Sequence, residues 1–109
     1  MEITEFTGED FKVVKKTESW KIGFLRYSDR FADFGVLERH METEESFFLM
    51  EGSAVLYEDF QPYDMEKGKV YSISKGVWHH IVVSKDATVI VVENADTSLE
   101  NTERKPVVS

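Results

Sequence analysis

The sequence of 109 residues contains no cysteine. Disulfide bonds, thiolate metal ligands and a thiol nucleophile are therefore all excluded. Any metal ion that this chain holds must be bound through nitrogen and oxygen atoms.

Basic residues are scarce relative to acidic ones. The chain has 13 Lys and Arg against 21 Asp and Glu, which gives a formal net charge of -8. A surface of this charge repels polyanions. We therefore expect neither nucleic acid nor an anionic membrane as a partner.

Long apolar runs are also missing. The N-terminal stretch MEITEFTGEDF has no basic start followed by an apolar segment, and no stretch approaches the roughly 20 apolar residues of a membrane helix. The sequence has no glycine-rich phosphate loop, no nucleophile elbow and no basic stripe with interleaved aromatics. We expect a cytoplasmic protein without a phosphate-loop or serine-nucleophile site.

The residues that are present predict one folded domain. The chain is 41% hydrophobic and 13% aromatic, which supplies enough apolar surface to offset the entropy of an unfolded chain. Its length suits a single core, so residues 1–109 are predicted to form one domain. The segment after Asn94 is polar, and we expect this tail, residues 95–109, to form a short helical turn or a loose strap.

The local pattern is that of β-strands. Short runs rich in Val, Ile, Phe and Tyr alternate with turn-forming residues, which is typical of an all-β chain. The predicted strands are Lys12–Lys16, Trp20–Tyr27, Gly35–Met41, Ser46–Met50, Ser53–Asp59, Lys69–Ser74, His79–Ser84 and Ala87–Glu93. Glu51-Gly52 and Lys85-Asp86 are predicted to be tight hairpin connections, and Lys67-Gly68 another turn.

Several of these strands are apolar on both faces. Phe47 and Leu49 point one way, whereas Phe48 and Met50 point the other. One face can fill the interior of a barrel, but the other must pack against a second sheet or a second subunit. We therefore expect a homodimer.

All three histidines fall at two places, His40 and the pair His79-His80. Residues two apart in a strand share a face, so Glu38 projects with His40, and Glu45 opens the next strand. If that face is the barrel interior, His79 can complete a set of two nitrogen and two oxygen donors. Such a set suits divalent Zn, Mn, Fe, Ni or Co. His80 should point to the opposite face.

Other side chains are candidates for the same cavity. Trp78, Tyr71, Tyr57 and Phe47 could line its mouth, although large aromatics in a small barrel more often belong to the core. Arg26 could bind a substrate carboxylate in bidentate fashion if its strand points inward.

The spacing of the first histidine segment resembles the first motif of the cupin superfamily. The intervals from His40 to Glu45 and from Glu45 to Gly52 fit that motif, with Glu38 in place of the first of its paired histidines. In an alternative alignment His40 is the first histidine and Glu42 takes the second position, but the interval to Glu45 is then one residue short.

The second histidine segment resembles the second cupin motif. Gly68, Ser74, Gly76 and His79 reproduce its frame, with Ser74 in place of the usual proline and Val83 in place of the usual asparagine. The run ERHMETEESFFLMEG together with GVWHHIVV also resembles the small cupins grouped with ureidoglycolate hydrolase (lyase), which cleave a carbon-nitrogen bond in a small ureido acid.

The resemblance implies a double-stranded β-helix, or jelly-roll barrel, over about residues 11–94, with the site at one mouth. It also implies a metal-dependent lyase, hydrolase or isomerase acting on a ureido acid, hydroxy acid or sugar derivative. His40, Glu45 and His79 would be metal ligands, and Glu38 a fourth ligand or a catalytic general base. The alternative is a non-catalytic barrel that binds a small molecule, because the fold supports both.

Overall fold

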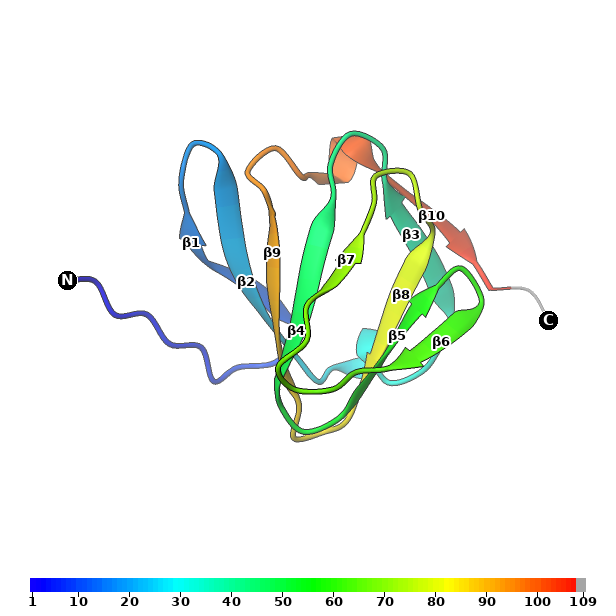
Figure 1. Cartoon of the computed structure of the whole chain (residues 1–109), viewed down its shortest axis with the longest axis horizontal. Coiled ribbons are helices and arrows are strands. Elements are labelled where there is room, and N and C mark those ends of the chain that lie inside the picture. Colours follow the sequence, from blue (N-terminus) through cyan, green and yellow to red (C-terminus); the bar gives the residue numbers. More distant parts are fainter. Residues whose placement is uncertain (108–109) are drawn as a thin grey trace.

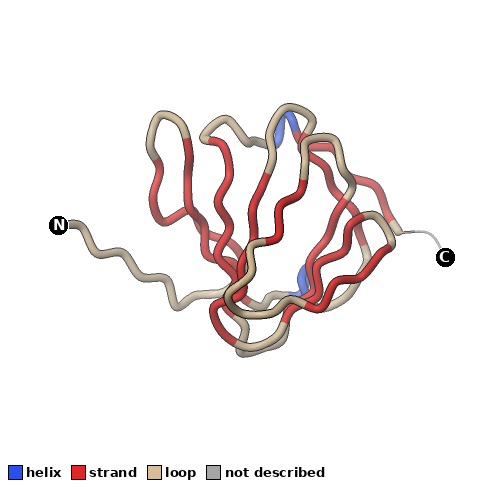
Figure 2. The backbone as a smooth tube through the Cα atoms, in the orientation of Figure 1, coloured by secondary structure: helices blue, strands red, loops and turns tan. Residues whose placement is uncertain are grey.

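The computed structural model describes residues 1–107. Within this range it has ten strands and two 3₁₀ turns, and the order of the elements is shown in Figures 1 and 2. The strands are β1 (Phe11–Lys16), β2 (Trp20–Arg26), β3 (Val36–His40), β4 (Glu45–Glu51), β5 (Ala54–Glu58), β6 (Gln61–Asp64), β7 (Tyr71–Ile73), β8 (His79–Val83), β9 (Thr88–Asn94) and β10 (Thr102–Pro106). The 3₁₀ turns are η1 (Asp29–Phe31) and η2 (Leu99–Asn101).

The strands form two five-stranded antiparallel sheets that face each other. The first sheet has the order β1-β2-β9-β4-β7 and the second has the order β10-β3-β8-β5-β6. The chain crosses repeatedly from one sheet to the other, as Figure 1 shows, which is the arrangement of a jelly roll. The predicted all-β double-stranded β-helix is therefore confirmed. No helix within residues 1–107 is long and apolar enough to cross a membrane.

The core lies between the two sheets. Leu56 projects into it from the second sheet, and Phe47, Val89 and Val91 from the first, all at most 3% exposed. Burial alternates along β4 and β9, as expected for strands with one face toward a core. This alternation decides which polar side chains reach the barrel interior.

Two tight connections link the sheets at one end of the barrel. The predicted hairpins at Glu51-Gly52 and Lys85-Asp86 are wrong, because β4 and β5 lie in different sheets, and so do β8 and β9. The connections instead pack on each other, with the Ser84 amide donating to the Ser53 carbonyl at 2.9 Å. Gly52 has a φ of +73°, and a Cβ there would lie 2.6 Å from the Ala87 Cα. Glycine is required by both the backbone conformation and the close approach.

The sequence analysis did not predict two of the strands, β6 and β10. β6 consists of exposed residues, so it lacks the apolar alternation of a core strand. The polar tail does form a short helical turn, η2, but it continues as β10, which pairs with β3 along its length (Figure 1). A polar segment becomes a strand here because β3 offers an unpaired edge to it.

Candidate metal centre

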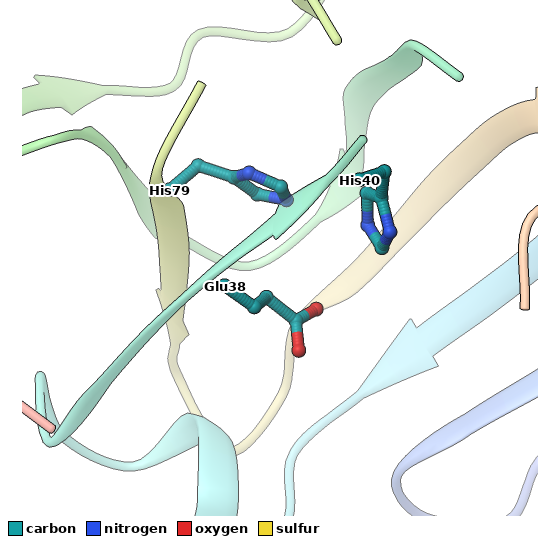
Figure 3. A group of neighbouring side chains, drawn as sticks. All are labelled: Glu38, His40 and His79. Carbon is teal, nitrogen blue, oxygen red and sulfur yellow. The ribbon is translucent and has the colours of Figure 1, made fainter. Parts of the chain in front are cut away.

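Three strands from the two sheets bring the candidate side chains to the interior. Glu38 and His40 lie on β3, Glu45 opens β4 and His79 opens β8. In the strand registers, Glu38 is opposite His79, and Glu45 is opposite Glu93 of β9. Figure 3 shows Glu38, His40 and His79 directed toward a common space.

His40 is buried and uses its two ring nitrogens differently. Its Nδ1 lies 2.8 Å from the Thr102 Oγ1 of β10. Its Nε2 lies 2.5 Å from the Glu45 Oε1, yet it has no hydrogen bond of acceptable geometry to any described residue. A buried ring nitrogen this close to a carboxylate, without a directed proton between them, is arranged as a cation ligand would be.

His79 approaches the same carboxylate oxygen. Its Nε2 lies 3.0 Å from the Glu45 Oε1, and its Nδ1 lies 3.0 Å from the Val77 carbonyl oxygen. A carbonyl only accepts, so Nδ1 carries the proton and Nε2 faces the site. Burial lowers the pKa of His79, but the bond to Glu45 and the charge of Glu45 outweigh this and raise it overall.

Glu45 is the point on which both imidazoles converge. Burial raises the pKa of its carboxyl group, but the close approach of the His40 and His79 ring nitrogens outweighs burial, and the pKa lies well below the usual range. Glu45 is therefore an ionised carboxylate inside the barrel. Such a group needs a cationic partner in the same place.

Glu93 is a member of the site that the sequence analysis missed. Burial, followed by a hydrogen bond to Glu45 and the charge of Glu45, raises the pKa of Glu93 to about 8. The Lys21 Nζ lies 3.8 Å from the Glu93 Oε1. The residue pattern of β9 could have predicted that Glu93 points inward, because Val89, Val91 and Glu93 lie on the same face of the strand.

Glu38 lies at the edge of the cluster. It is half-buried, and its Oε2 accepts a hydrogen bond from the Arg104 Nε of β10 at 3.1 Å. One of its carboxylate oxygens is nevertheless within 4.8 Å of ring nitrogens of His40 and His79. Glu38 is thus close enough to join the donors and is also held by a surface arginine.

The donor atoms form two groups that could each hold a metal ion. Glu38, His40 and His79 make one group, and His40, Glu45 and Glu93 make the other, each with all ligand atoms within 4.8 Å of one another. Nitrogen and oxygen donors in this number suit a divalent transition metal. The unpaired Nε2 of His40 also fits a metal, because a lone pair there would be directed at the ion.

A cavity of about 550 Å³ opens beside these donors. Its apolar wall includes Phe11, Leu25, Phe31, Phe47 and Val91, and its cationic residues are Lys21, Arg30 and Arg104. A site of this size, with one polar pole and apolar walls, is suited to a small metabolite.

Several candidates are not among the donors. His80 borders the cavity, but its ring nitrogen Nε2 lies 2.9 Å from the Asp33 carbonyl oxygen. The Arg26 Nη1 donates to Thr88 Oγ1 at 2.8 Å. The Trp78 ring contacts the charged groups of Arg39 and Lys105. Among the four aromatics considered, Phe47 lines the cavity.

Comparison of the sequence with protein families finds one match. The model described as "Cupin domain" matches residues 33–93, which span β3 to β9 and include every candidate donor. Among curated proteins, none matches the sequence.

Solved structures share the fold. Pac13 from Streptomyces, a nucleoside dehydratase solved with uridine, is 8% identical and has a TM-score of 0.74, with 97% of this chain and 87% of Pac13 covered. A cupin-2 domain protein from Shewanella frigidimarina is 21% identical, with a TM-score of 0.66 and coverage of 82% and 84%. KdgF from Halomonas is 16% identical, with a TM-score of 0.66 and coverage of 81% and 79%. At these identities the likeness concerns the fold alone.

Proposed function

Because this chain belongs to the Cupin domain family, we propose that it is a metal-dependent enzyme that acts on a small polar metabolite within its barrel. His40, Glu45 and His79 are the proposed ligands of one divalent metal ion, and Glu38 is a fourth ligand or a general base. Zn, Mn, Fe, Ni and Co are the candidate ions, since all accept nitrogen and oxygen donors.

The convergence of two imidazoles on one buried carboxylate oxygen supports this proposal most directly. The Nε2 atoms of His40 and His79 lie 2.5 Å and 3.0 Å from the same Glu45 Oε1. Each Nδ1 has a separate partner, so both Nε2 atoms are available to an ion at the centre. A cation between them would neutralise Glu45 and use the unpaired nitrogen of His40.

A bound ion of this kind polarises a substrate carbonyl or lowers the pKa of a bound water. The chain's own residues would shape the rest of the reaction. Glu38 stands at the cavity edge, where it could accept a proton from the substrate. The apolar wall around Phe31 and Phe47 limits water, which strengthens electrostatic interactions inside the cavity.

The proposed substrates are ureido acids, hydroxy acids and sugar derivatives. The cavity of about 550 Å³ has the size of sites that hold such molecules. A structural neighbour of this chain was solved with uridine, which is a small polar molecule that contains both a sugar and a ureido-type ring. We also propose that the chain belongs to the ureidoglycolate hydrolase-like group and cleaves a carbon-nitrogen bond in its substrate.

A non-catalytic binding barrel is the second candidate. One observation favours it: Glu38 replaces a histidine of the usual cupin motif and is bonded to Arg104, which makes it a weaker ligand. In that case the His and Glu side chains would serve as hydrogen-bond partners for a small molecule.

A homodimer is also part of the proposal. Aromatic residues gather on the face of the second sheet that points away from the core, where Phe34 stacks on Tyr57 at 4.0 Å between ring centroids and Phe60 is 58% exposed. Covering this surface with a second subunit would remove it from water. Light scattering on the purified protein would give the mass of a dimer, whereas a monomer mass would refute this part.

Metal analysis tests the proposed site. Wild-type protein purified without chelators should carry about one equivalent of a transition metal, and the variant His79→Ala should lose it, because one of three strong ligands is gone. His80→Ala is the matched control, since His80 is buried beside His79 but bonds to Asp33, and this variant should keep the metal.

The same experiment separates the two functions. A wild-type protein without stoichiometric metal that nevertheless binds a metabolite would refute the metal-dependent enzyme and support the binding barrel. Metal that survives in His79→Ala would show that the proposed ligands are wrong.

A further inference from the structure

The C-terminal strand contributes to the candidate site although it lies outside the family match. β10 begins at Thr102, whereas the segment that matches the Cupin domain ends at residue 93. Thr97, Ser98, Thr102 and Arg104 nevertheless line the cavity. These residues are therefore a feature of this chain beyond the part that defines its family.

Thr102 contacts His40 in a way that determines where the imidazole proton lies. The Thr102 Oγ1 donates to the Ser98 carbonyl oxygen at 2.6 Å, and the same Oγ1 is 2.8 Å from the His40 Nδ1. A hydroxyl has a single proton, and a carbonyl oxygen can only accept. Because Thr102 gives its proton to Ser98, its oxygen must accept from His40 Nδ1–H.

The Ser98 acceptor is itself fixed by the η2 turn. The Ser98 amide donates to the Asn101 Oδ1 at 3.1 Å, and the Asn101 side-chain amide donates to the Asp96 carbonyl at 2.8 Å. The Asn101 carbonyl accepts from the Met41 amide at 2.8 Å, next to His40. These bonds hold the hydroxyl of Thr102 in one orientation.

We propose that Thr102 is a positioning residue that keeps the proton of neutral His40 on Nδ1, so that the lone pair of Nε2 faces the site. The inference deepens the proposed metal site and rests on it for its consequence in metal binding. His79 obtains the same tautomer from the Val77 backbone carbonyl. At His40 the acceptor of the Nδ1 proton is instead the side chain of Thr102. A substitution can therefore remove this acceptor at His40 but not at His79.

Three variants test the role of Thr102. Thr102→Val keeps the shape and removes the hydroxyl, whereas Thr102→Ser keeps the hydroxyl. Thr88→Val makes the same change at another buried threonine, whose Oγ1 accepts from Arg26 near the opposite end of β9 from Glu93. This third variant shows how far the loss of any buried threonine hydroxyl changes the two readouts below.

The first readout is the tautomer of His40 in metal-free protein, from ¹⁵N chemical shifts of the ring at about pH 9. Wild type, Thr102→Ser and Thr88→Val should show the proton on Nδ1, and Thr102→Val should show a mixture of tautomers. The second readout is the Zn²⁺ dissociation constant, which should rise about 10- to 100-fold in Thr102→Val and stay near wild type in the other two variants.

Several results would overturn this role. One is a His40 proton on Nε2 in the wild type, which can be measured even if Thr102→Val does not fold. Another is a folded Thr102→Val protein with unchanged tautomer and unchanged Zn²⁺ affinity. A wild type that carries the Nδ1 proton but binds no Zn²⁺ would refute the proposed function and leave the positioning role supported.

Discussion

At the scale of single residues, strand alternation explains which polar groups enter the barrel. Because Glu38 and His40 are two apart, they share a face, and Glu45 shares one with Phe47. The sequence therefore predicted that these side chains and His79 would meet, and the structure brings them together. Glu93 was overlooked because acidic residues at strand ends are usually solvated, whereas burial here depends on its partner Glu45 across the sheet.

Glu93 should make the stability of the metal-free protein depend on pH. Its pKa is about 8 in the folded protein against 4.5 for the ordinary group, so the folded state retains a proton that the unfolded state releases. The resulting stability is complete below pH 4.5 and is lost as pH rises through about 8. The raised pKa of His79 acts in the same direction.

The variant Glu93→Gln tests this dependence, since it is neutral at every pH. Urea unfolding is measured in the presence of a chelator. Between pH 5 and pH 9, the free energy of unfolding of wild type should fall by about 1–3 kcal/mol more than that of Glu93→Gln. Glu18→Gln, at an exposed glutamate between β1 and β2, should follow the wild-type curve. Parallel curves for wild type and Glu93→Gln would show that Glu93 does not hold the proton.

At the scale of elements, the strands were easier to predict than their partners. Runs such as β4 and β9 carry their own apolar pattern, but nothing local shows that β4 continues into the opposite sheet rather than into a hairpin. β10 is a strand only because the edge of β3 is free, which is a property of the assembled sheet. Its residues Thr102 and Arg104 could therefore not be assigned to the site from sequence.

The packed connections between the sheets give a prediction at this scale. Gly52→Ala should cost about 3 kcal/mol or more, because its Cβ would meet the Ala87 backbone in addition to the strain of a positive φ. Gly68→Ala is the matched control, with a φ of +85° and no neighbouring atom within 4 Å of the added Cβ. It should cost about 1 kcal/mol in urea unfolding. An equal loss of unfolding free energy in the two variants would mean that the close contact between Gly52 and Ala87 does not contribute to stability.

At the scale of the whole molecule, the proposed metal site should couple metal binding to folding. A ligand that binds only the folded chain stabilises it by about 2.7 kcal/mol at a free concentration 100 times its dissociation constant. Adding Zn²⁺ at that level to chelator-treated wild type should raise the free energy of unfolding by this amount. His79→Ala should show no such gain, and an equal gain in that variant would place the ion elsewhere.

Metal binding should also release protons. Because the pKa of His79 is raised by Glu45, its Nε2 keeps a proton to higher pH than an ordinary histidine does, and an ion must displace that proton. Zn²⁺ affinity should therefore increase with pH. Calorimetry in two buffers of different ionisation enthalpy would measure the released protons, and identical binding heats would contradict this coupling.

The central claim is that His40, Glu45 and His79 together bind a metal ion. Crystals of the metal-loaded protein, measured at the absorption edge of the metal, test it most directly through an anomalous difference map. The account predicts one strong peak about 2.0–2.2 Å from the Nε2 atoms of His40 and His79 and from a Glu45 carboxylate oxygen. A fully loaded protein with its peak outside this cluster, or without a peak inside the barrel, would contradict the claim.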